Sequence, residues 1–267
     1  MSKLLSYLSA ITGWAYFILW STSFYPILWT LYYYKDATGI SIDFPIFGIF
    51  GFMMYSIYVY TGFIYPQIGT NHVPVQDVFY VTHSAMLNST IVTGVLIFKN
   101  GNQRINWFTY FVIISWIIST IVIFILEMTG FIAGNRYLNT AMFGGYIKDV
   151  LTLFKYIPQI YRNYIRKSTK GFNIWTINTD LAGGFFSYLQ LLIDSMIDRN
   201  ANVLNGGFNI GKFGLSVISI VFSLIFAIQH YWLYREDIQI GDKPGTKIED
   251  YMSNSNQPLS MKCDKEY

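Results

Sequence analysis

Long apolar stretches separated by short polar breaks organise almost the whole of this chain. Seven of them are about 20 residues long, the length that a helix needs to cross roughly 30 Å of hydrocarbon at 1.5 Å per residue. The pattern predicts seven transmembrane helices, so the two termini lie on opposite sides of the membrane. The expected spans are Leu8–Tyr33, Phe44–Ile64, Val78–Phe98, Trp107–Leu126, Leu138–Tyr161, Ile174–Ile193 and Phe213–Tyr234.

Basic residues are distributed unevenly between the two sets of loops. The odd-numbered loops and the C-terminal flank hold Lys35, Lys99, Arg104, Arg162, Arg166, Lys167, Lys170 and Arg235. The N-terminus and the even-numbered loops hold only Lys3, Arg136, Arg199 and Lys212. The positive-inside rule therefore predicts a lumenal N-terminus and a cytosolic C-terminus. Residues 236–267 are polar and too poor in apolar side chains to fold alone, which predicts a disordered cytosolic tail.

Composition agrees with a membrane protein and excludes several function classes. Charged residues make up 12% of the chain and hydrophobic residues 53%, whereas soluble domains carry about 25% charged residues. The formal net charge of +3 suggests no nucleic-acid partner. Cys263 is the only cysteine, so a multi-cysteine metal site is excluded. We see no paired nucleophile and base and no metal-ligand cluster, and therefore expect neither an enzyme nor a metal or organic cofactor.

Two segments half a chain apart repeat the same pattern. The stretch from Phe24 to Ile42 aligns without a gap with the stretch from Tyr156 to Ile174, and proline, lysine, glycine and isoleucine recur at equivalent positions. Because four spans separate them, both units enter the membrane in the same direction. We predict an all-α membrane protein with two parallel three-helix bundles joined by a linker helix. The expected boundaries are 1–98 for the first repeat, 99–134 for the linker, 135–235 for the second repeat and 236–267 for the tail.

Each repeat carries one proline within its first span, Pro26 and Pro158. A proline removes one backbone hydrogen bond, and in lipid the freed carbonyl must find another donor or a polar cavity. Either residue alone is equally compatible with an ordinary kink. Their equivalent positions favour a pair of hinges.

The second repeat reads Lys155-Tyr156-Ile157-Pro158-Gln159 and continues to Lys167-Ser168-Thr169. This pattern resembles the PQ-loop family of membrane transporters. Within that family the chain resembles the cystinosins, of a fungal type, along nearly all of its helical part. The blocks that carry the resemblance are Gly13–Pro26, Asp77–His83, Lys148–Gln159, Asp180–Gln190 and Phe213–Arg235.

The resemblance implies proton-coupled export of cystine from an acidic lysosomal or vacuolar lumen to the cytosol by alternating access, with protons as the coupling ion. An endosomal membrane is an alternative location. Ile27 stands where the family has glutamine, and Gly48 and Thr176 stand where asparagines are expected to line the pocket. A related amino acid therefore remains open as the substrate. A sugar transporter and a seven-helix sorting or retrieval receptor also fit this architecture.

Three charged residues within the spans are the main candidates for this chemistry. Asp180 and Lys155 both lie about six residues from the cytosolic ends of adjacent antiparallel spans, so similar depths are expected. Lys148 lies two helical turns deeper on nearly the same face as Lys155. We expect Asp180 to carry the proton and the two lysines to bind substrate carboxylates, because charge inside a membrane is costly and usually functional. A fixed salt bridge between Asp180 and Lys155 without a transport role is the alternative.

Further candidates have weaker support. Asp77 opens the third span, where it serves either as a helix N-cap or as a second proton site. Gln159 and Asn163 either present amides to the substrate or bond to the backbone loosened by proline. Trp14 and Trp20 in the first span are expected to shield one wall of the cavity, and Thr176 to line the pocket.

Overall fold

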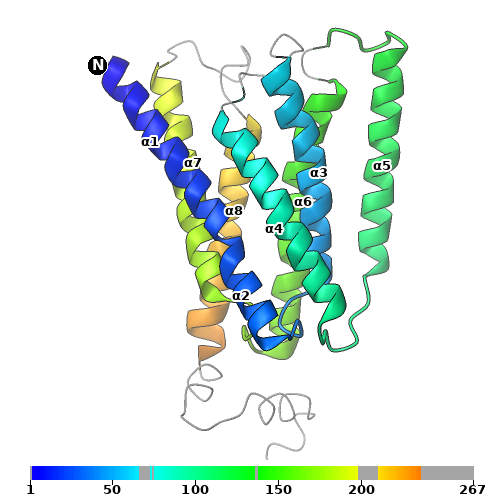
Figure 1. The fold of residues 1–267 in the computed structure, drawn as a ribbon, viewed down its shortest axis with the longest axis vertical. Helices are drawn as coiled ribbons and strands as arrows, with labels where there is room; N and C mark the ends of the chain where they lie inside the picture. The colour runs from blue at the N-terminus through cyan, green and yellow to red at the C-terminus, as the bar shows by residue number, and fades with distance from the viewer. Residues whose placement is uncertain (1, 66–72, 74, 136–137, 198–209, 236–267) are drawn as a thin grey trace, which may run out of the picture.

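The structure is a computed structural model and describes residues 2–65, 73, 75–135, 138–197 and 210–235. Long helices run side by side between the two ends of the molecule (Figure 1). They are α1 (Ser2–Thr22), α2 (Phe24–Tyr34), α3 (Asp43–Ile64), α4 (Val75–Ile97), α5 (Trp107–Met128), α6 (Thr140–Arg166), α7 (Ile174–Ile197) and α8 (Ile210–Ile228), which continues into a π-helical turn, η2 (Gln229–Leu233).

These elements confirm the predicted all-α membrane fold. The first span is formed by α1 and α2 together, a stretch long and apolar enough to cross a membrane from Lys3 to Tyr34. The last span is formed by α8 and η2. The largest difference at a cytosolic end is in α6, which continues to Arg166, five residues past the expected Tyr161. Basic side chains end the apolar stretch, but they are good helix formers and do not end the helix.

The two prolines have different effects on their helices. The helical assignment of the first span is interrupted at Ser23, three residues before Pro26, although Ser23 keeps helical dihedrals and its amide donates to Leu19 O across 3.1 Å. Pro158 instead lies inside the uninterrupted helix α6. The continuity of the helix thus differs between the two repeats, and hinge motion at either proline stays a prediction.

Four stretches of the described chain are apolar and long enough to span a membrane, namely Lys3–Tyr34, Asp43–Ile64, Trp107–Met128 and Lys212–Leu233. The other predicted spans, α4, α6 and α7, are 23, 27 and 24 residues long. Their buried faces carry polar side chains, among them Asn88, Lys148 and Gln190. These three helices are less apolar because their polar residues face the protein interior.

The helix contacts close into a ring. In the first repeat, α1, α2 and α3 pack against α4, and in the second repeat α6 and α7 pack against α8. The two most extensive interfaces, α3 with α6 and α1 with α7, join the repeats. Exchanging the repeats exchanges these two interfaces, as a two-fold relationship between the halves requires. Helix α5 lies at the edge of the bundle in Figure 1 and contacts α6 and α3. The exact domain boundaries stay a prediction, and the expected tail lies outside the described residues.

The two repeats also share their turn geometry. Lys35 ends α2 and Lys167 ends α6, and both adopt a left-handed conformation with φ of 50°. Four residues later, Gly39 and Gly171 touch each other: a Cβ on Gly39 would lie 2.5 Å from the Cα of Gly171. Only glycine permits this approach of two backbones. The two equivalent loops therefore meet at the end of the bundle that is expected to face the cytosol.

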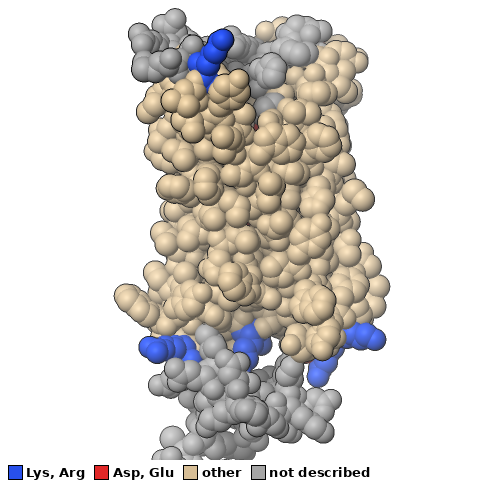
Figure 2. Space-filling model, turned by 60° about the vertical axis from the view of Figure 1, so that its left-hand side comes forward, with Lys and Arg blue, Asp and Glu red and all other residues tan. Residues whose placement is uncertain are grey.

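Figure 2 shows Lys and Arg side chains at the two ends of the molecule, and the band between them carries none on the face shown. Large apolar side chains of this band are exposed, including Trp29, Phe111, Ile118 and Phe185. Such a continuous apolar surface is expected where a protein contacts lipid.

Candidate functional site

Asp180, in the second turn of α7, is surrounded by hydroxyl groups. The Tyr156 hydroxyl of α6 donates to Oδ2 across 2.8 Å. Ser219 and Ser223 of α8 donate to the same oxygen across 2.8 and 3.2 Å. A hydroxyl can donate to an ionised carboxylate and can also accept from a protonated one. The arrangement therefore suits a group that gains and loses a proton within the membrane.

Two glycines that follow Asp180 allow neighbouring helices to approach it. A Cβ on Gly183 would lie 2.4 Å from the indole of Trp20 on α1, and one on Gly184 would lie 3.2 Å from Ser219 on α8. Trp20 donates its Nε1 hydrogen to the backbone oxygen of Asp180 across 3.2 Å. The sequence Asp-Leu-Ala-Gly-Gly thus brings α1 and α8 against the turn that carries the carboxylate.

Lys155 lies beside this carboxylate without forming the expected ion pair. Its ammonium is 4.5 Å from the centre of the Tyr156 ring and 5.5 Å from that of Phe44. No hydrogen bond or ion pair joins Lys155 to another described residue. Tyr156 contacts both charged groups, since the Lys155 ammonium lies over its ring and its hydroxyl donates to Asp180. The salt-bridge interpretation is therefore wrong for this conformation, and the half-buried ammonium is available to an anionic ligand.

Lys148 lies two turns away on the same face of α6 and is 3% exposed. Its Nζ donates to Thr152 Oγ1 across 2.8 Å and is 4.5 Å from the centre of the Phe52 ring of α3. Gly51 leaves room for the aliphatic part of this lysine, since a Cβ there would meet its Cδ at 3.3 Å. The interface between the two repeats therefore contains both lysines.

Gln159 and Asn163 are fully buried and engaged with protein groups. Gln159 accepts from the Ser41 amide across 2.7 Å and donates to the Gly39 oxygen and to Asn163. Asn163 donates to Gln229 in η2 across 3.0 Å. In this structure these amides bind protein groups other than the backbone loosened by proline, and their contact with a substrate stays a prediction. They hold the first repeat's loop against α6 and η2, because that loop has buried backbone groups that need partners.

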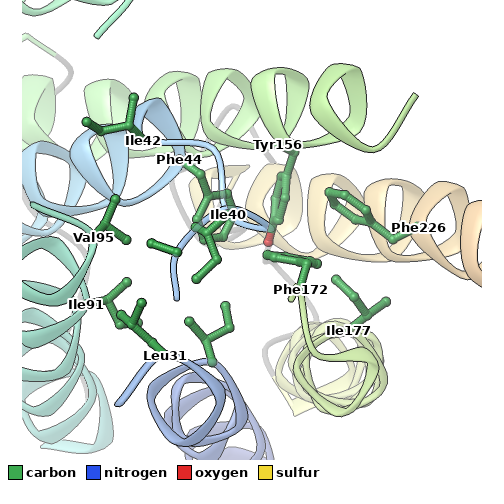
Figure 3. Close-up of a cluster of buried hydrophobic side chains, with 12 residues drawn as sticks. Leu31, Ile40, Ile42, Phe44, Ile91, Val95, Tyr156, Phe172, Ile177 and Phe226 are labelled. Atoms are coloured by element: carbon green, nitrogen blue, oxygen red, sulfur yellow. The ribbon is translucent and has the colours of Figure 1, made fainter. Parts of the chain in front are cut away.

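An apolar cluster fills the same end of the bundle. Figure 3 shows its side chains converging from loops and from helices of both repeats. Its buried members are Ile27, Leu31, Ala37, Ile40, Ile42, Phe44, Ile91, Val95, Tyr156, Phe172, Ile177 and Phe226. Tyr156 belongs both to this cluster and to the Asp180 site. The cluster and the buried amides close the bundle between Asp180 and the end with the basic loops.

Asp77 lies within the first turn of α4 and is not the N-cap of that helix. Its carboxylate accepts the hydroxyl hydrogen of Tyr16 on α1. The ammonium of Lys212 is 4.4 Å from the centre of the Tyr16 ring and donates to Gln190 across 2.5 Å. This second polar group joins α1, α4, α7 and α8 at the end opposite the basic loops. A proton-coupling role for Asp77 stays a prediction.

The remaining candidates differ in their surroundings. The Thr176 hydroxyl is buried without a hydrogen-bond partner, which is compatible with its predicted place in the pocket. Gly48 is covered by Asn88, since a Cβ at Gly48 would lie 2.7 Å from the Asn88 amide oxygen. Trp14 is 42% exposed and packs against Phe17 and Phe79. Its place in the cavity wall stays a prediction. Trp20 lies six residues further along α1, about 120° round the helix, and it is the tryptophan that binds the Asp180 backbone.

Sequence reasoning missed several residues of the site. Tyr156, Ser219 and Ser223 resemble ordinary helix and membrane-interface residues, and only their approach to Asp180 distinguishes them. Asp149 was also missed, although a carboxylate in the middle of an apolar stretch is itself a signal of function.

Comparison with known proteins supports the repeat and the resemblance. Residues 8–68 and 141–196 match the family described as PQ loop repeat. Cystinosin of Bos taurus is 34% identical over 255 residues, covering 91% of this chain and 66% of that protein. The cystinosin homolog of Dictyostelium discoideum is 34% identical, covering 86% of this chain and 83% of that protein. A Saccharomyces cerevisiae protein named cystine transporter is 27% identical, covering 85% and 94%. The chain thus spans about two thirds of the bovine protein's length.

Proposed function

Because the chain belongs to the cystinosin family of PQ-loop membrane proteins, we propose that it transports cystine, or a closely related amino acid, together with protons. The names of its relatives suggest the substrate. The observation that carries the coupling is the Asp180 carboxylate with its three hydroxyl partners. These partners suit both protonation states of a group inside the membrane, as a proton carrier requires.

Substrate binding is assigned to the face of α6 that carries the lysines. The ammonium of Lys155, which has no ion-pair partner among the described residues, binds one substrate carboxylate, and Lys148 binds another after leaving Thr152. Asp180 lies close enough to Tyr156 for its protonation to change the charge that Lys155 and the substrate experience. Loading of substrate and proton is thereby coupled through neighbouring groups.

Alternating access requires the closed end of the bundle to open. The apolar cluster and the Gln159–Asn163 amides close that end in this structure. We propose that they separate once Asp180 and the lysines are occupied. The end with the basic loops faces the cytosol, as the positive-inside rule indicates. The substrate then leaves an acidic lysosomal or vacuolar lumen.

The transport proposal is tested with the full chain purified into proteoliposomes. Labelled cystine uptake and dye-reported proton flux are measured together, with lysine, arginine and glucose as competing solutes. We expect cystine to drive proton movement in the same direction and the competitors to have little effect. Folded protein that shows no cystine-dependent proton flux would contradict the proposal, and uptake of another solute would replace the substrate.

Orientation is tested in intact organelles on a Cys263→Ser background. Lys99→Cys lies in the loop after α4, and Thr129→Cys lies at the opposite end, at the cap of α5. A membrane-impermeant maleimide is expected to label Lys99→Cys before permeabilisation and Thr129→Cys only after it. The reverse pattern would invert the orientation.

A further inference from the structure

Asp149 is a second carboxylate within the bundle, and the transport mechanism above does not use it. It lies on α6, is half-buried, and has no hydrogen bond or ion pair with another described residue. It faces α8 at Gly214, where a Cβ would lie 3.8 Å from Asp149 Oδ2. An unpaired carboxylate inside a membrane protein is costly, so a function that needs it is expected.

The register of α6 relates Asp149 to the Asp180 site. Lys148 and Lys155 are seven residues apart, as are Asp149 and Tyr156, so each pair shares a helix face at levels about 10 Å apart. At the first level an ammonium, Lys148, neighbours a carboxylate, Asp149. At the second level the ammonium is Lys155, and Tyr156 binds the carboxylate of Asp180. An ammonium and a carboxylate therefore occur at both levels, with Asp149 on α6 at the first and Asp180 on α7 at the second.

Two such pairs match a ligand with two amino-acid head groups. Each head group carries one ammonium and one carboxylate, and a disulfide places the two α-carbons about 4.4–6.8 Å apart. The charged atoms extend beyond the α-carbons at both ends, and the flexible four-carbon stems of the lysines can cover the remaining distance. Two cations and two carboxylates also leave the empty site without net charge. An amino acid with a single head group can satisfy only one of the two levels.

We propose that Lys148 and Asp149 form a second head-group site and that Asp149 selects substrates with an ammonium at both ends. This inference rests on the proposed cystine transport. The Asp149 carboxylate accepts hydrogen bonds from the second ammonium, and Lys148 binds the second carboxylate. Asp149 is then a specificity residue that contacts substrate, distinct from the proton carrier Asp180.

The test compares Asp149→Asn with the unmodified chain on two substrates in proteoliposomes. One is cystine, and the other is the mixed disulfide of cysteine and 3-mercaptopropionate, which lacks one ammonium. Loss of the ammonium should raise the KM of the unmodified chain by about tenfold, equivalent to one lost charged contact. Asp149→Asn should raise the KM for cystine similarly and leave that for the mixed disulfide nearly unchanged, since the two losses remove the same contact.

Asp194→Asn serves as the matched control, because Asp194 is an exposed carboxylate of α7 that binds Ser9. It should change neither KM. Equal weakening of both substrates by Asp149→Asn, or a changed number of protons per cystine, would overturn the inference. If Asp149→Asn does not fold, the unmodified chain still tests the inference. Equal KM values of the unmodified chain for the two disulfides would also overturn it. If the unmodified chain fails to transport cystine, the proposed function itself fails.

Discussion

The two repeats share a backbone plan but differ in chemistry. Both end their first helix in a left-handed lysine, and their loops meet at Gly39 and Gly171. The interior of the first repeat is apolar at Ile27, whereas the equivalent position of the second repeat is Gln159. The duplicated scaffold therefore keeps its turns, while the polar groups that do the proposed work gather in one half.

The same difference appears in the second helix of each repeat. Gly48 lies six residues after Ile42, as Asp180 lies six residues after Ile174. The side chain of Asn88 fills the space beside Gly48 and donates to the Pro45 oxygen across 2.9 Å. The carboxylate of Asp180 instead accepts hydrogen bonds from three hydroxyl groups. At this equivalent position the third helix of each repeat provides polar side chains, Asn88 on α4 in the first repeat and Ser219 and Ser223 on α8 in the second.

The largest difference between the two repeats is expected in pH-driven uptake, when Asp180 is changed in one repeat and the equivalent Gly48 in the other. A gradient of about two pH units stores about 2.7 kcal/mol per proton, enough for roughly hundredfold accumulation. Asp180→Asn should abolish this accumulation, because an amide takes up no proton at working pH, while substrate binding survives. Gly48→Ala should retain coupling even if it weakens packing against Asn88. Uptake into vesicles with an imposed pH gradient measures both variants, and retained accumulation in folded Asp180→Asn would remove the assignment.

Exchanging the residues at the equivalent interior position should have a smaller effect. Gln159→Ile leaves buried groups of Gly39 and Ser41 without partners, at about 1–3 kcal/mol each, and should lower the midpoint of thermal unfolding in detergent. Ile27→Gln buries one additional amide among apolar side chains, at about 1–3 kcal/mol in total. Thermal unfolding at matched protein levels compares them. Equal destabilisation would show that the amide does not hold the two halves together.

The smallest effect is expected at the shared turns. Lys35→Gly and Lys167→Gly remove the cost of a left-handed conformation, about 1–2 kcal/mol, and increase the entropy of the unfolded chain, which offsets most of that gain. Each variant should therefore change stability by less than about 1 kcal/mol, and the two changes should agree. Strongly unequal changes in the unfolding midpoint would show that the loops are less equivalent than their backbones indicate.

The sequence predicted the spans and the repeat well, and the partners of the site residues less well. Apolar length is a local property, so the ends of α3 and α5 were predicted to within a few residues. The depth of Lys155 and Asp180 was also accessible, because depth follows from position along a helix. Their shared contact with Tyr156 was not, since it depends on how α6 and α7 are rotated about their axes.

By itself the sequence determined that this chain is an all-helical membrane protein with a duplicated plan and charged residues within it. A bilayer constrains each helix along a single direction, and hydrophobic length and loop charge record that constraint directly. Only the tertiary structure decided that Asp180 pairs with hydroxyls, that Gln159 binds the opposite loop, and that Trp20 donates to the backbone of Asp180. Those contacts join residues far apart in sequence, and they depend on helix rotation and on close approaches that glycine permits.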